Sequence, residues 1–314
     1  MNRRVTEFLK IPEKMRVPFL NRINYQLTSI LENLSIKREK IPSNPMNDKE
    51  REERVIVSLT SMTHRINCVH LAIKSLMLQT YKPDRIVLWL VKDEFPNLNE
   101  LPKELLELQK YGLEIIHCSK NLYGHKKYFY ALKEQKPNEV VITYDDDIIY
   151  PVNSIELLMK AHTKYKSAIV CNRAQACELN KDGSYINPGN WKIINDVGVK
   201  GPSYNLCPST GGGCLYPYDV LYKDYNDEEL LMRLADKSDD LWIMFMAAAN
   251  GTPIVKSRKY HRTFTAIEGS QIYSLAIGNI VENGYDAVMK GLIEAYPEAW
   301  KKISTVNDGT KGNK

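Results

Sequence analysis

The 314-residue sequence lacks the long apolar runs that mark membrane-spanning and exported proteins. Its longest apolar run, residues 241–249, is too short to cross a bilayer, and its N-terminus has no apolar core of the signal-peptide kind. No C-x-x-C pair occurs among the six cysteines, so we expect reduced, mostly buried thiols and no zinc site. Together these absences predict a cytoplasmic protein.

Two phosphate-binding signatures are also absent. The sequence contains neither a Walker loop nor a G-x-G-x-x-G motif, which argues against a P-loop enzyme and against a dinucleotide-dependent dehydrogenase. The composition is that of a globular protein, with 43% hydrophobic and 26% charged residues. A chain of this length can bury a sizeable core in one large domain or two ordinary ones.

The net positive charge is confined to one end of the chain. Residues 1–40 carry nine Lys/Arg and four Glu, a net charge of +5 that equals the net charge of the whole protein. The remainder therefore sums to zero, and we expect no nucleic-acid-binding face on it. The basic segment also has apolar residues at helical spacing, namely Ile23, Leu27, Ile30, Leu31 and Leu34.

Two interpretations of this basic amphipathic segment remain open. It can rest on anionic lipid, which would hold the protein peripherally at the inner face of the cytoplasmic membrane. It can equally be an accessory helix packed on the domain that follows. A polar stretch with two prolines, residues 41–53, is typical of a linker, so residues 1–53 are expected to form a helical extension and its linker.

From residue 54 onward, strand and helix patterns alternate regularly. Such alternation with short links predicts an α/β fold: a mostly parallel sheet with helices on both faces. The strands are expected at 55–57, 85–90, 113–116, 140–144, 168–171 and 254–257, and the helices at 66–79, 101–111, 127–135 and 153–165. Ligands of such sheets bind at the carboxyl ends of the strands.

Three carboxylates stand at one of these strand ends. Asp145, Asp146 and Asp147 directly follow a β-branched run that is typical of a strand buried on both faces. Asp145 and Asp147 are two residues apart, so in extended chain their side chains point to the same side. Two such carboxylates suit Mg²⁺ or Mn²⁺ shared with the phosphates of a substrate. The alternative is a polar turn that caps the helix starting near Asn153.

Other strand ends are expected to supply further contacts. Hydroxyl groups and a cation follow the first strand, including Thr60, Ser61 and Arg65. Arg65 is placed to pair with a phosphate, although a surface arginine in a helix-start loop is equally compatible with the pattern. After the third strand, residues 121–127 bring a glycine and Lys127 to a helix N-terminus, where anions are favoured.

These motifs in this order resemble family-2 glycosyltransferases of the GT-A (Rossmann-like) fold. The resemblance covers roughly residues 54–265 and is carried by Val55-Ile-Val-Ser-Leu-Thr, Ser75-Leu-Met-Leu-Gln-Thr-Tyr81, Arg85-Ile-Val-Leu and Asp145-Asp-Asp147. It is closest to bacterial cytoplasmic enzymes that build surface polysaccharides such as lipopolysaccharide and capsule. It implies a nucleotide-sugar donor, a saccharide acceptor, a donor half at 54–151 and an acceptor half at 152–265.

The resemblance also assigns roles on the donor side. The D-x-D motif of the family holds a divalent metal, Mn²⁺ or Mg²⁺, on the donor diphosphate. Asp145 and Asp147 match its outer positions and Asp146 lies nearer the sugar and ribose. Thr60, Ser61, Arg65 and Lys127 would join the donor site. A UDP-sugar is the favoured donor. The acidic pair that often follows the second strand in relatives is replaced by Val91-Lys-Asp-Glu94, so the identity of the donor base stays open.

The acceptor half contains two candidate binding elements. Gly211, Gly212 and Gly213 form a glycine-rich loop that lets backbone approach a ligand and that matches the acceptor-side glycine segment of the family; the alternative is a bulge or tight turn. Trp191 lies in an irregular stretch, 172–208, and is a candidate for stacking on a sugar ring. A buried structural tryptophan is at least as compatible with the sequence.

The catalytic residues are expected at Asp239 and Asp240. Ser238 and the two acids are typical of a helix N-terminus, and relatives carry an acidic pair here. By the resemblance, Asp240 is the general base that deprotonates the acceptor hydroxyl, with inversion at the anomeric carbon. His261 occupies the place of a family metal ligand. Helices are expected at 267–280 and 285–296, within a C-terminal region 266–302, before a disordered tail at 303–314.

Two other functions fit part of the pattern. A sugar nucleotidyltransferase also binds nucleotide and metal on an α/β sheet, but it ordinarily has a glycine-rich loop after the first strand, and residues 58–65 contain no glycine. A non-catalytic carbohydrate-binding protein would need neither the three strand-end aspartates nor the pair at 239–240.

Overall fold

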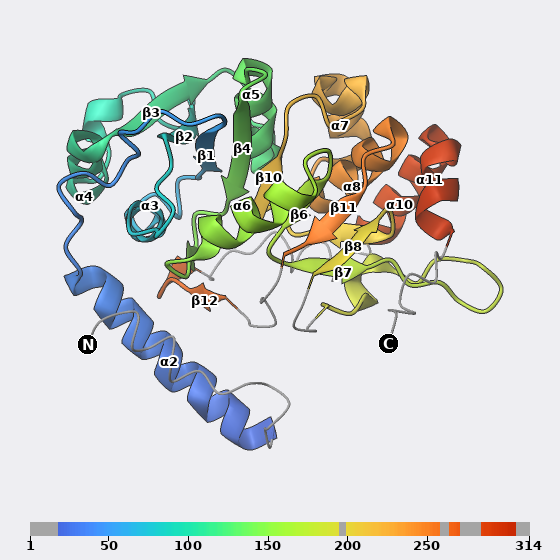
Figure 1. Ribbon diagram of the computed structural model, residues 1–314, viewed down its shortest axis with the longest axis horizontal. Coiled ribbons are helices and arrows are strands. Elements are labelled where there is room, and N and C mark those ends of the chain that lie inside the picture. The colour runs from blue at the N-terminus through green and yellow to red at the C-terminus, as the bar shows by residue number, and fades with distance from the viewer. Residues whose placement is uncertain (1–17, 195–198, 258–263, 271–283, 306–314) are drawn as a thin grey trace.

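The computed structural model describes residues 18–194, 199–257, 264–270 and 284–305 of the chain (Figure 1). Its centre is an eight-stranded sheet with the strand order β3-β2-β1-β4-β10-β6-β11-β8. The strands of this sheet are β1 (Arg54–Thr60), β2 (Arg85–Val91), β3 (Leu113–Cys118), β4 (Glu139–Tyr144), β6 (Ile169–Cys171), β8 (Lys200–Ser203), β10 (Gly212–Tyr216) and β11 (Ile254–Lys256).

The sheet is mostly parallel. β1 pairs in parallel with both β2 and β4, β2 pairs in parallel with β3, and β6 pairs in parallel with β11. β10 runs antiparallel between β4 and β6, and β8 is an antiparallel edge strand on β11. The α/β architecture expected from the alternating pattern is therefore confirmed, and β10 is the strand that joins its two halves.

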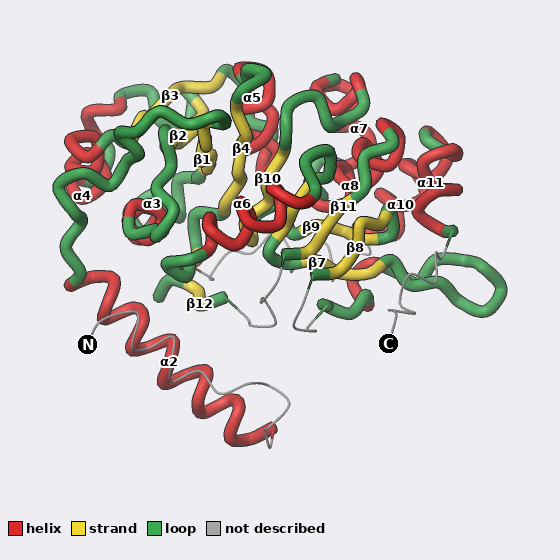
Figure 2. Tube along the Cα trace, in the orientation of Figure 1, coloured by secondary structure: helices red, strands yellow, loops and turns green. Residues whose placement is uncertain are grey.

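Helices cover both faces of the sheet (Figure 2). They are α3 (Val69–Met77), α4 (Lys103–Leu106), α5 (Lys126–Glu134), α6 (Ser154–Lys164), α7 (Glu228–Ala235), α8 (Asp239–Asn250), α10 (Gly284–Ala295) and α11 (Pro297–Ser304). Alternate strand residues face opposite cores: Val55 and Val57 pack with α3, α4 and α6, whereas Ile56 packs with α5, α8, α10 and α11. Strands buried on both faces explain the near-continuous apolar runs in the sequence.

Some expected elements differ from those observed. The helix expected at 101–111 is a short α-helix, α4, followed by a 3₁₀ turn that ends at Gly112. Ile267 does not begin a helix, because residues 265–266 form strand β12, which pairs with β5 (Ile148–Ile149). The remainder of that expected helix lies largely outside the described residues. The stretch 172–208 contains the short strands β7 (Ala174–Ala176), β8 and β9 (Leu206–Pro208).

The N-terminal extension is helical. α2 (Pro18–Arg38) packs against α3, β5 and β12 and extends away from the body of the protein (Figure 1). These contacts agree with the accessory-helix interpretation of the segment, and its contact with lipid stays a prediction. None of the helices in the described ranges is long and apolar enough to cross a membrane.

A glycine in β10 allows the sheet to close next to β4. Gly213 has φ +94°, and a Cβ at this position would lie 2.7 Å from Asn172 Nδ2 and 2.9 Å from the Tyr144 ring. Gly183 has a similar φ, +86°, but a Cβ there would meet no atom within 4 Å. The two glycines therefore share the backbone strain that a side chain would cause and differ in steric overlap.

This pair gives a stability prediction. We expect Gly183→Ala to cost about 1 kcal/mol of unfolding free energy, because only left-handed backbone strain is added. Gly213→Ala should cost at least about 3 kcal/mol, since overlap with the buried Asn172 and Tyr144 is added to the same strain. Urea unfolding of both variants measures the difference, and equal costs would contradict the packing role of Gly213.

Candidate active site

A pocket of about 200 Å³ lies at the carboxyl ends of β1 and β4. It is lined by Thr60, Ser61, Met62, Arg65, Tyr123, Gly124, His125, Lys127, Asp145, Asp146, Asp147, Lys237, Asp239, Asp240 and Tyr285. The parallel arrangement of β1 and β4 brings their ends to one edge, as the sequence predicts. The structure therefore gathers nine of the predicted site residues around one pocket, namely Thr60, Ser61, Arg65, Lys127, Asp145, Asp146, Asp147, Asp239 and Asp240.

Asp145 carries the most accessible carboxylate of the triplet. Its side chain is 40% exposed, and its Oδ1 lies 2.7 Å from Lys127 Nζ. Its backbone N–H is held by the Tyr150 hydroxyl at 2.8 Å, and that hydroxyl donates to the Gly211 carbonyl at 2.6 Å. The end of β4 is thus tied to the loop before β10, with the Asp145 carboxylate open to the pocket.

The other two aspartates share one cation. Arg65 Nη1 lies 3.0 Å from Asp146 Oδ1 and 3.1 Å from Asp147 Oδ2, and the Ser61 hydroxyl donates to Asp146 Oδ2 at 2.6 Å. Burial raises the pKa of Asp146, and Arg65 opposes that rise without cancelling it. Asp146 and Asp147 lie in a turn, so the expected extended chain is wrong for this structure, but Asp145 and Asp147 both line the pocket.

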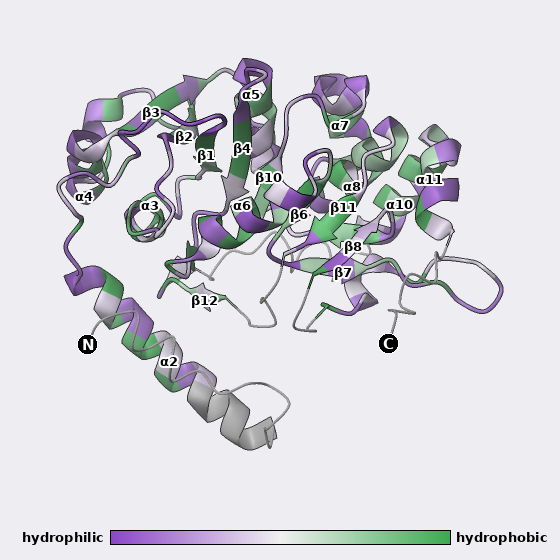
Figure 3. Ribbon diagram, viewed as in Figure 1, coloured by the Kyte–Doolittle hydropathy of each residue, from purple (hydrophilic) through white to green (hydrophobic). Residues whose placement is uncertain are grey.

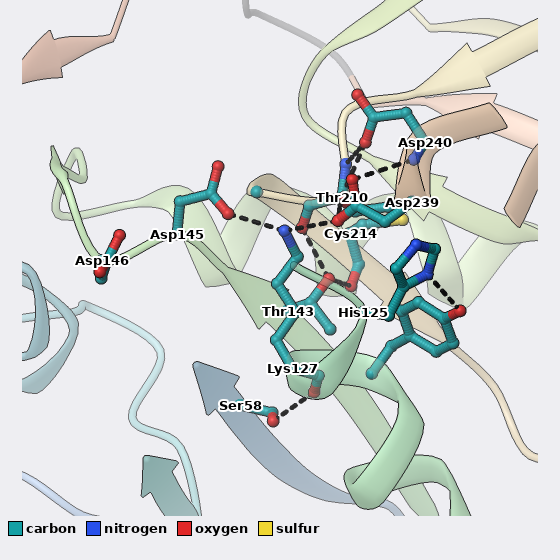
Figure 4. Close-up of polar contacts among 12 residues, drawn as sticks. Ser58, His125, Lys127, Thr143, Asp145, Asp146, Thr210, Cys214, Asp239 and Asp240 are labelled. Carbon is teal, nitrogen blue, oxygen red and sulfur yellow. Dashed lines mark hydrogen bonds and ion pairs between the residues drawn. The ribbon is translucent and has the colours of Figure 1, made fainter. Parts of the chain in front are cut away.

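Lys127 joins the triplet to the second acidic pair. Its Nζ lies 2.7 Å from Asp145 Oδ1 and 2.8 Å from Asp239 Oδ2, and its side chain is only 4% exposed (Figure 4). Burial alone would lower the pKa of Lys127, but Asp145 and Asp239 outweigh it and hold the pKa above its ordinary value. A buried ammonium therefore stays charged between two carboxylates from β4 and α8.

Asp239 and Asp240 begin α8 and differ in protonation. Burial raises the pKa of Asp239, but Lys127 outweighs it and brings the pKa below its usual range. Burial, and then the neighbouring charge of Asp239, raise the pKa of Asp240 to about 7. The Thr210 N–H donates to Asp240 Oδ1 at 2.8 Å, and its hydroxyl lies 2.7 Å from Asp239 Oδ2. Adjacent carboxyls in distinct environments suit distinct chemical roles.

The expected cap of α8 is only partly right. Ser238 occupies the N-cap position, but its hydroxyl donates to and accepts from no group in the described chain. The N-terminal turn of the helix instead carries the two acids, and Asp239 accepts from the Asp240 N–H at 3.2 Å. Acidic groups at this end are favoured by the helix dipole, so the local sequence still explains where α8 begins.

The glycine-rich loop leaves space for the Asp145 carboxylate. A Cβ on Gly211 would lie 1.7 Å from Asp145 Oδ2, so only glycine leaves room for that carboxylate. Gly212 and Gly213 are residues of β10, where a Cβ on Gly212 would touch the Phe264 ring at 3.0 Å. The bulge alternative is the one observed, because the β4–β10 register shifts between Gly212 and Cys214. Contact of these glycines with an acceptor stays a prediction.

Trp191 does not reach the pocket. The ring is 4% exposed, belongs to the hydrophobic core, and donates its Nε1–H to the Ile186 carbonyl at 2.7 Å. The interpretation of Trp191 as a sugar platform is therefore wrong for this structure, and the structural alternative is observed. His261 lies outside the described residues.

Six pocket-lining residues were not predicted from the sequence, namely Met62, Tyr123, Gly124, His125, Lys237 and Tyr285. Thr210, which hydrogen-bonds Asp239 and Asp240, was not predicted either. His125 is fully buried; its Nε2–H donates to the Ala235 carbonyl at 2.8 Å and its Nδ1 accepts from the Tyr128 hydroxyl. Burial lowers the pKa of His125, so this imidazole is neutral. Thr210 directly precedes the three glycines, and that position next to a glycine-rich turn was the one available signal for it.

The charges of the pocket fit a divalent cation. Five carboxyl groups line it against three cationic side chains, Arg65, Lys127 and Lys237. A nucleotide diphosphate would meet a net negative site unless a cation accompanied it. Asp145 and Asp147 supply the carboxylate oxygens that Mg²⁺ or Mn²⁺ prefers. In the described residues, no cluster of three His, Cys, Asp or Glu side chains is preformed, so phosphate and water oxygens would complete the coordination.

The buried position of Lys127 gives a second stability prediction. We expect Lys127→Met to lower the unfolding free energy by about 3–5 kcal/mol at neutral pH, because Asp145 and Asp239 lose their shared cation. Lys127 holds the pKa of Asp239 low against the effect of burial. In Lys127→Met that cation is gone, so the pKa of Asp239 rises and its protonation as pH falls relieves the buried unpaired charge. The cost of Lys127→Met should therefore shrink toward pH 4.

Urea unfolding at pH 7 and pH 4 measures this dependence. Lys133 is the matched control, because it lies on the same helix, is exposed, and contacts only the Phe129 ring among the described aromatic groups. Lys133→Met should change stability by less than about 1 kcal/mol at both pH values. A cost of Lys127→Met that does not depend on pH would contradict its electrostatic role.

Comparison with known proteins adds a family assignment. Residues 61–224 match glycosyl transferase family 2. No curated protein matches the chain. Among solved structures it is similar to 4-diphosphocytidyl-2C-methyl-D-erythritol synthase from Anaerococcus prevotii DSM 20548, with 13% identity over 74% of this chain and 97% of that one, at a TM-score of 0.38. Because the family match spans more than half of the 314 residues, the chain belongs to glycosyl transferase family 2, whose GT-A-type α/β fold it has.

Proposed function

We propose that this protein is a metal-dependent, inverting glycosyltransferase that moves a sugar from a nucleotide-sugar donor, a UDP-sugar by preference, to a saccharide acceptor. The proposal includes a role in bacterial surface-glycan synthesis at the cytoplasmic side. One observation carries it: a strand-end triplet, Asp145 to Asp147, and a helix-start pair, Asp239 and Asp240, line the same pocket. Family membership supports the use of a nucleotide sugar.

The donor side is assigned to the residues near β1 and β4. Asp145 and Asp147 would hold the divalent cation, which when bound neutralises charge on the leaving diphosphate. Arg65 is fixed by Asp146 and Asp147, so its guanidinium is oriented toward the same edge. Lys127 adds a buried positive charge beside Asp145. Thr60 and Ser61 line the pocket wall, and their hydroxyls donate to the Trp89 carbonyl and to Asp146. Their oxygens would therefore accept hydrogen bonds from the nucleotide sugar.

Asp240 is assigned as the general base. A base must be deprotonated to accept the proton of the acceptor hydroxyl, and a pKa near the working pH makes that transfer efficient. Asp240 meets this condition because burial and Asp239 raise its pKa to about 7. Thr210 holds its carboxylate at 2.8 Å, and Asp239 is kept ionised by Lys127. Asp239 thus acts on Asp240 through its charge, as a positioning residue.

We assign the acceptor to the side of the pocket that is lined by Asp240 and Tyr285. Tyr285, from α10, lines this pocket and offers an aromatic ring of the kind that stacks on sugars. We propose that Tyr285 stacks on a ring of the acceptor sugar, the role that the sequence suggested for Trp191. Gly211, Gly212 and Gly213 would allow the acceptor to approach backbone next to Asp145.

Nucleotide binding tests the donor site. We expect one of UDP, GDP, dTDP or CMP to raise the unfolding temperature in the presence of Mn²⁺ and not with EDTA. Ligand at about 100 times its dissociation constant stabilises by roughly 2.7 kcal/mol, which corresponds to a shift of roughly 5 °C. The shift should vanish in Asp145→Asn/Asp147→Asn, because the cation loses both carboxylates.

A matched control separates this effect from charge removal in general. Asp182→Asn removes an exposed carboxylate in a surface turn with Ser184 and should keep the full shift. No shift with any nucleotide in folded protein would count against a nucleotide-sugar enzyme. Consumption of a nucleoside triphosphate with release of pyrophosphate would identify a sugar nucleotidyltransferase instead, and calcium-dependent sugar binding without nucleotide would identify a carbohydrate-binding protein.

The pH dependence of turnover tests Asp240. With the donor that the binding assay identifies, kcat/KM should fall about tenfold per pH unit below the pKa of Asp240, because protonation removes the base. Asp240→Asn should lower kcat by roughly 10²–10⁴-fold and remove this acidic limb, while the nucleotide-dependent thermal shift stays. Near-normal transfer by Asp240→Asn with intact donor binding would overturn the assignment.

A further inference from the structure

α2 attaches to the body of the protein through its polar side. Asn33 Nδ2 donates to the Ala266 carbonyl at 3.0 Å, and Asn33 Oδ1 accepts from the Glu268 N–H at 2.9 Å. The Thr265 hydroxyl donates to Glu32, and both side chains are buried. These contacts fix α2 to the strand β12 with hydrogen bonds, so the face of the helix that carries Glu32 and Asn33 is the inner face.

The opposite side of α2 is apolar and exposed. Leu27, Ile30, Leu31 and Leu34 follow the i, i+3, i+4, i+7 spacing of one helical stripe, and their exposed fractions are 56%, 56%, 38% and 44%. We call these four residues the outer face of α2. They are half of the eight exposed large hydrophobic side chains in the described chain, so the exposure is concentrated on one helix. Figure 3 shows that the described part of α2 carries both hydrophobic and hydrophilic residues along its length.

The C-terminal end of α2, next to this outer face, is basic. α2 has no acidic residue in its first turn and ends in Lys37 and Arg38, both exposed. Lys40 follows and is also exposed. The sequence of residues 1–40 carries a net charge of +5, whereas the other 274 residues sum to zero. An exposed apolar stripe on a basic segment is the combination that binds anionic bilayers.

We propose that the outer face of α2 docks on an anionic lipid surface. The four side chains would enter the boundary between headgroups and acyl chains. Lys37 already pairs with Glu268 at 3.1 Å, so the exposed Arg38 and Lys40 side chains would pair with anionic headgroups. A second copy of the chain fits this face less well, because pairing two outer faces would bring two segments of charge +5 together. This proposal concerns where the protein binds, at a membrane surface, and it does not depend on the proposed glycosyl-transfer reaction.

The docking would place the candidate active site close to the membrane. α2 packs on β5 and β12, and β5 directly follows Asp147 in the chain. Asp147 lines the pocket and directly precedes β5, so the pocket lies next to the strands on which α2 packs. Figure 1 shows α2 and β12 on the same side of the molecule. A docked helix would orient that side, rather than the opposite side, toward the bilayer.

Vesicle co-sedimentation of the full chain tests the proposal. We expect binding to vesicles of phosphatidylcholine mixed with phosphatidylglycerol, weak binding to phosphatidylcholine alone, and weakening by salt. Leu27→Gln/Ile30→Gln/Leu31→Gln/Leu34→Gln should lower the partition coefficient by at least about tenfold, because the buried apolar area is lost. Ile193→Gln/Tyr218→Ser, which removes exposed apolar side chains outside α2, should leave binding unchanged.

Three outcomes would overturn the proposal. Equal binding by wild type and the α2 variant would exclude the outer face as the contact. Absence of vesicle binding by the wild-type chain would exclude the lipid surface. Concentration-dependent dimerisation in sedimentation velocity, lost in the α2 variant, would assign the face to a second copy. The nucleotide thermal shift is measured on the same variant, so loss of the donor site is distinguished from loss of docking.

Discussion

The buried ammonium of Lys127 is the interaction on which the site depends. It bridges Asp145, at the end of β4, and Asp239, at the start of α8, with both distances below 3 Å. Five carboxyl groups around one pocket would repel one another without it. A second cation neutralises the other two members of the triplet, because Arg65 forms ion pairs with Asp146 and Asp147. Charge balance therefore decides which aspartate stays open to the pocket, and that residue is Asp145.

The same bridge gives two adjacent aspartates different properties. Asp239 touches Lys127 and remains ionised, whereas Asp240 lacks that contact and is next to a negative charge. Environment rather than residue type thus determines which of the two can exchange a proton near neutral pH. Thr210 connects this pair to the loop that carries Gly211, and Gly211 leaves the space for Asp145. The strand-end aspartates and the helix-start pair are consequently linked through Lys127 and through the loop of Thr210 and Gly211.

The sequence predicted the parts of the site that follow from strand order. The strand-end position of Asp145 to Asp147 and the helix-start position of Lys127 are local, and a parallel sheet necessarily brings such ends to one edge. Thr210 and Tyr285 could not be found this way, because their proximity depends on the loop before β10 and on the packing of α10. Trp191 was misassigned since composition does not distinguish a buried indole from an exposed one.

The orientation of α2 shows why helical spacing alone does not identify the buried face. Apolar spacing predicted the stripe from Leu27 to Leu34 correctly, yet the helix buries Thr28, Glu32, Asn33 and Ile36. β12 is a short edge strand, and the Ala266 carbonyl and Glu268 N–H beside it need hydrogen-bond partners. The Asn33 side chain provides both an N–H and a C=O, as a neighbouring strand would. Because the polar groups at this edge are hydrogen-bonded by Asn33, the polar face of α2 packs against β12. The apolar stripe of α2 is therefore exposed on the opposite side of the helix.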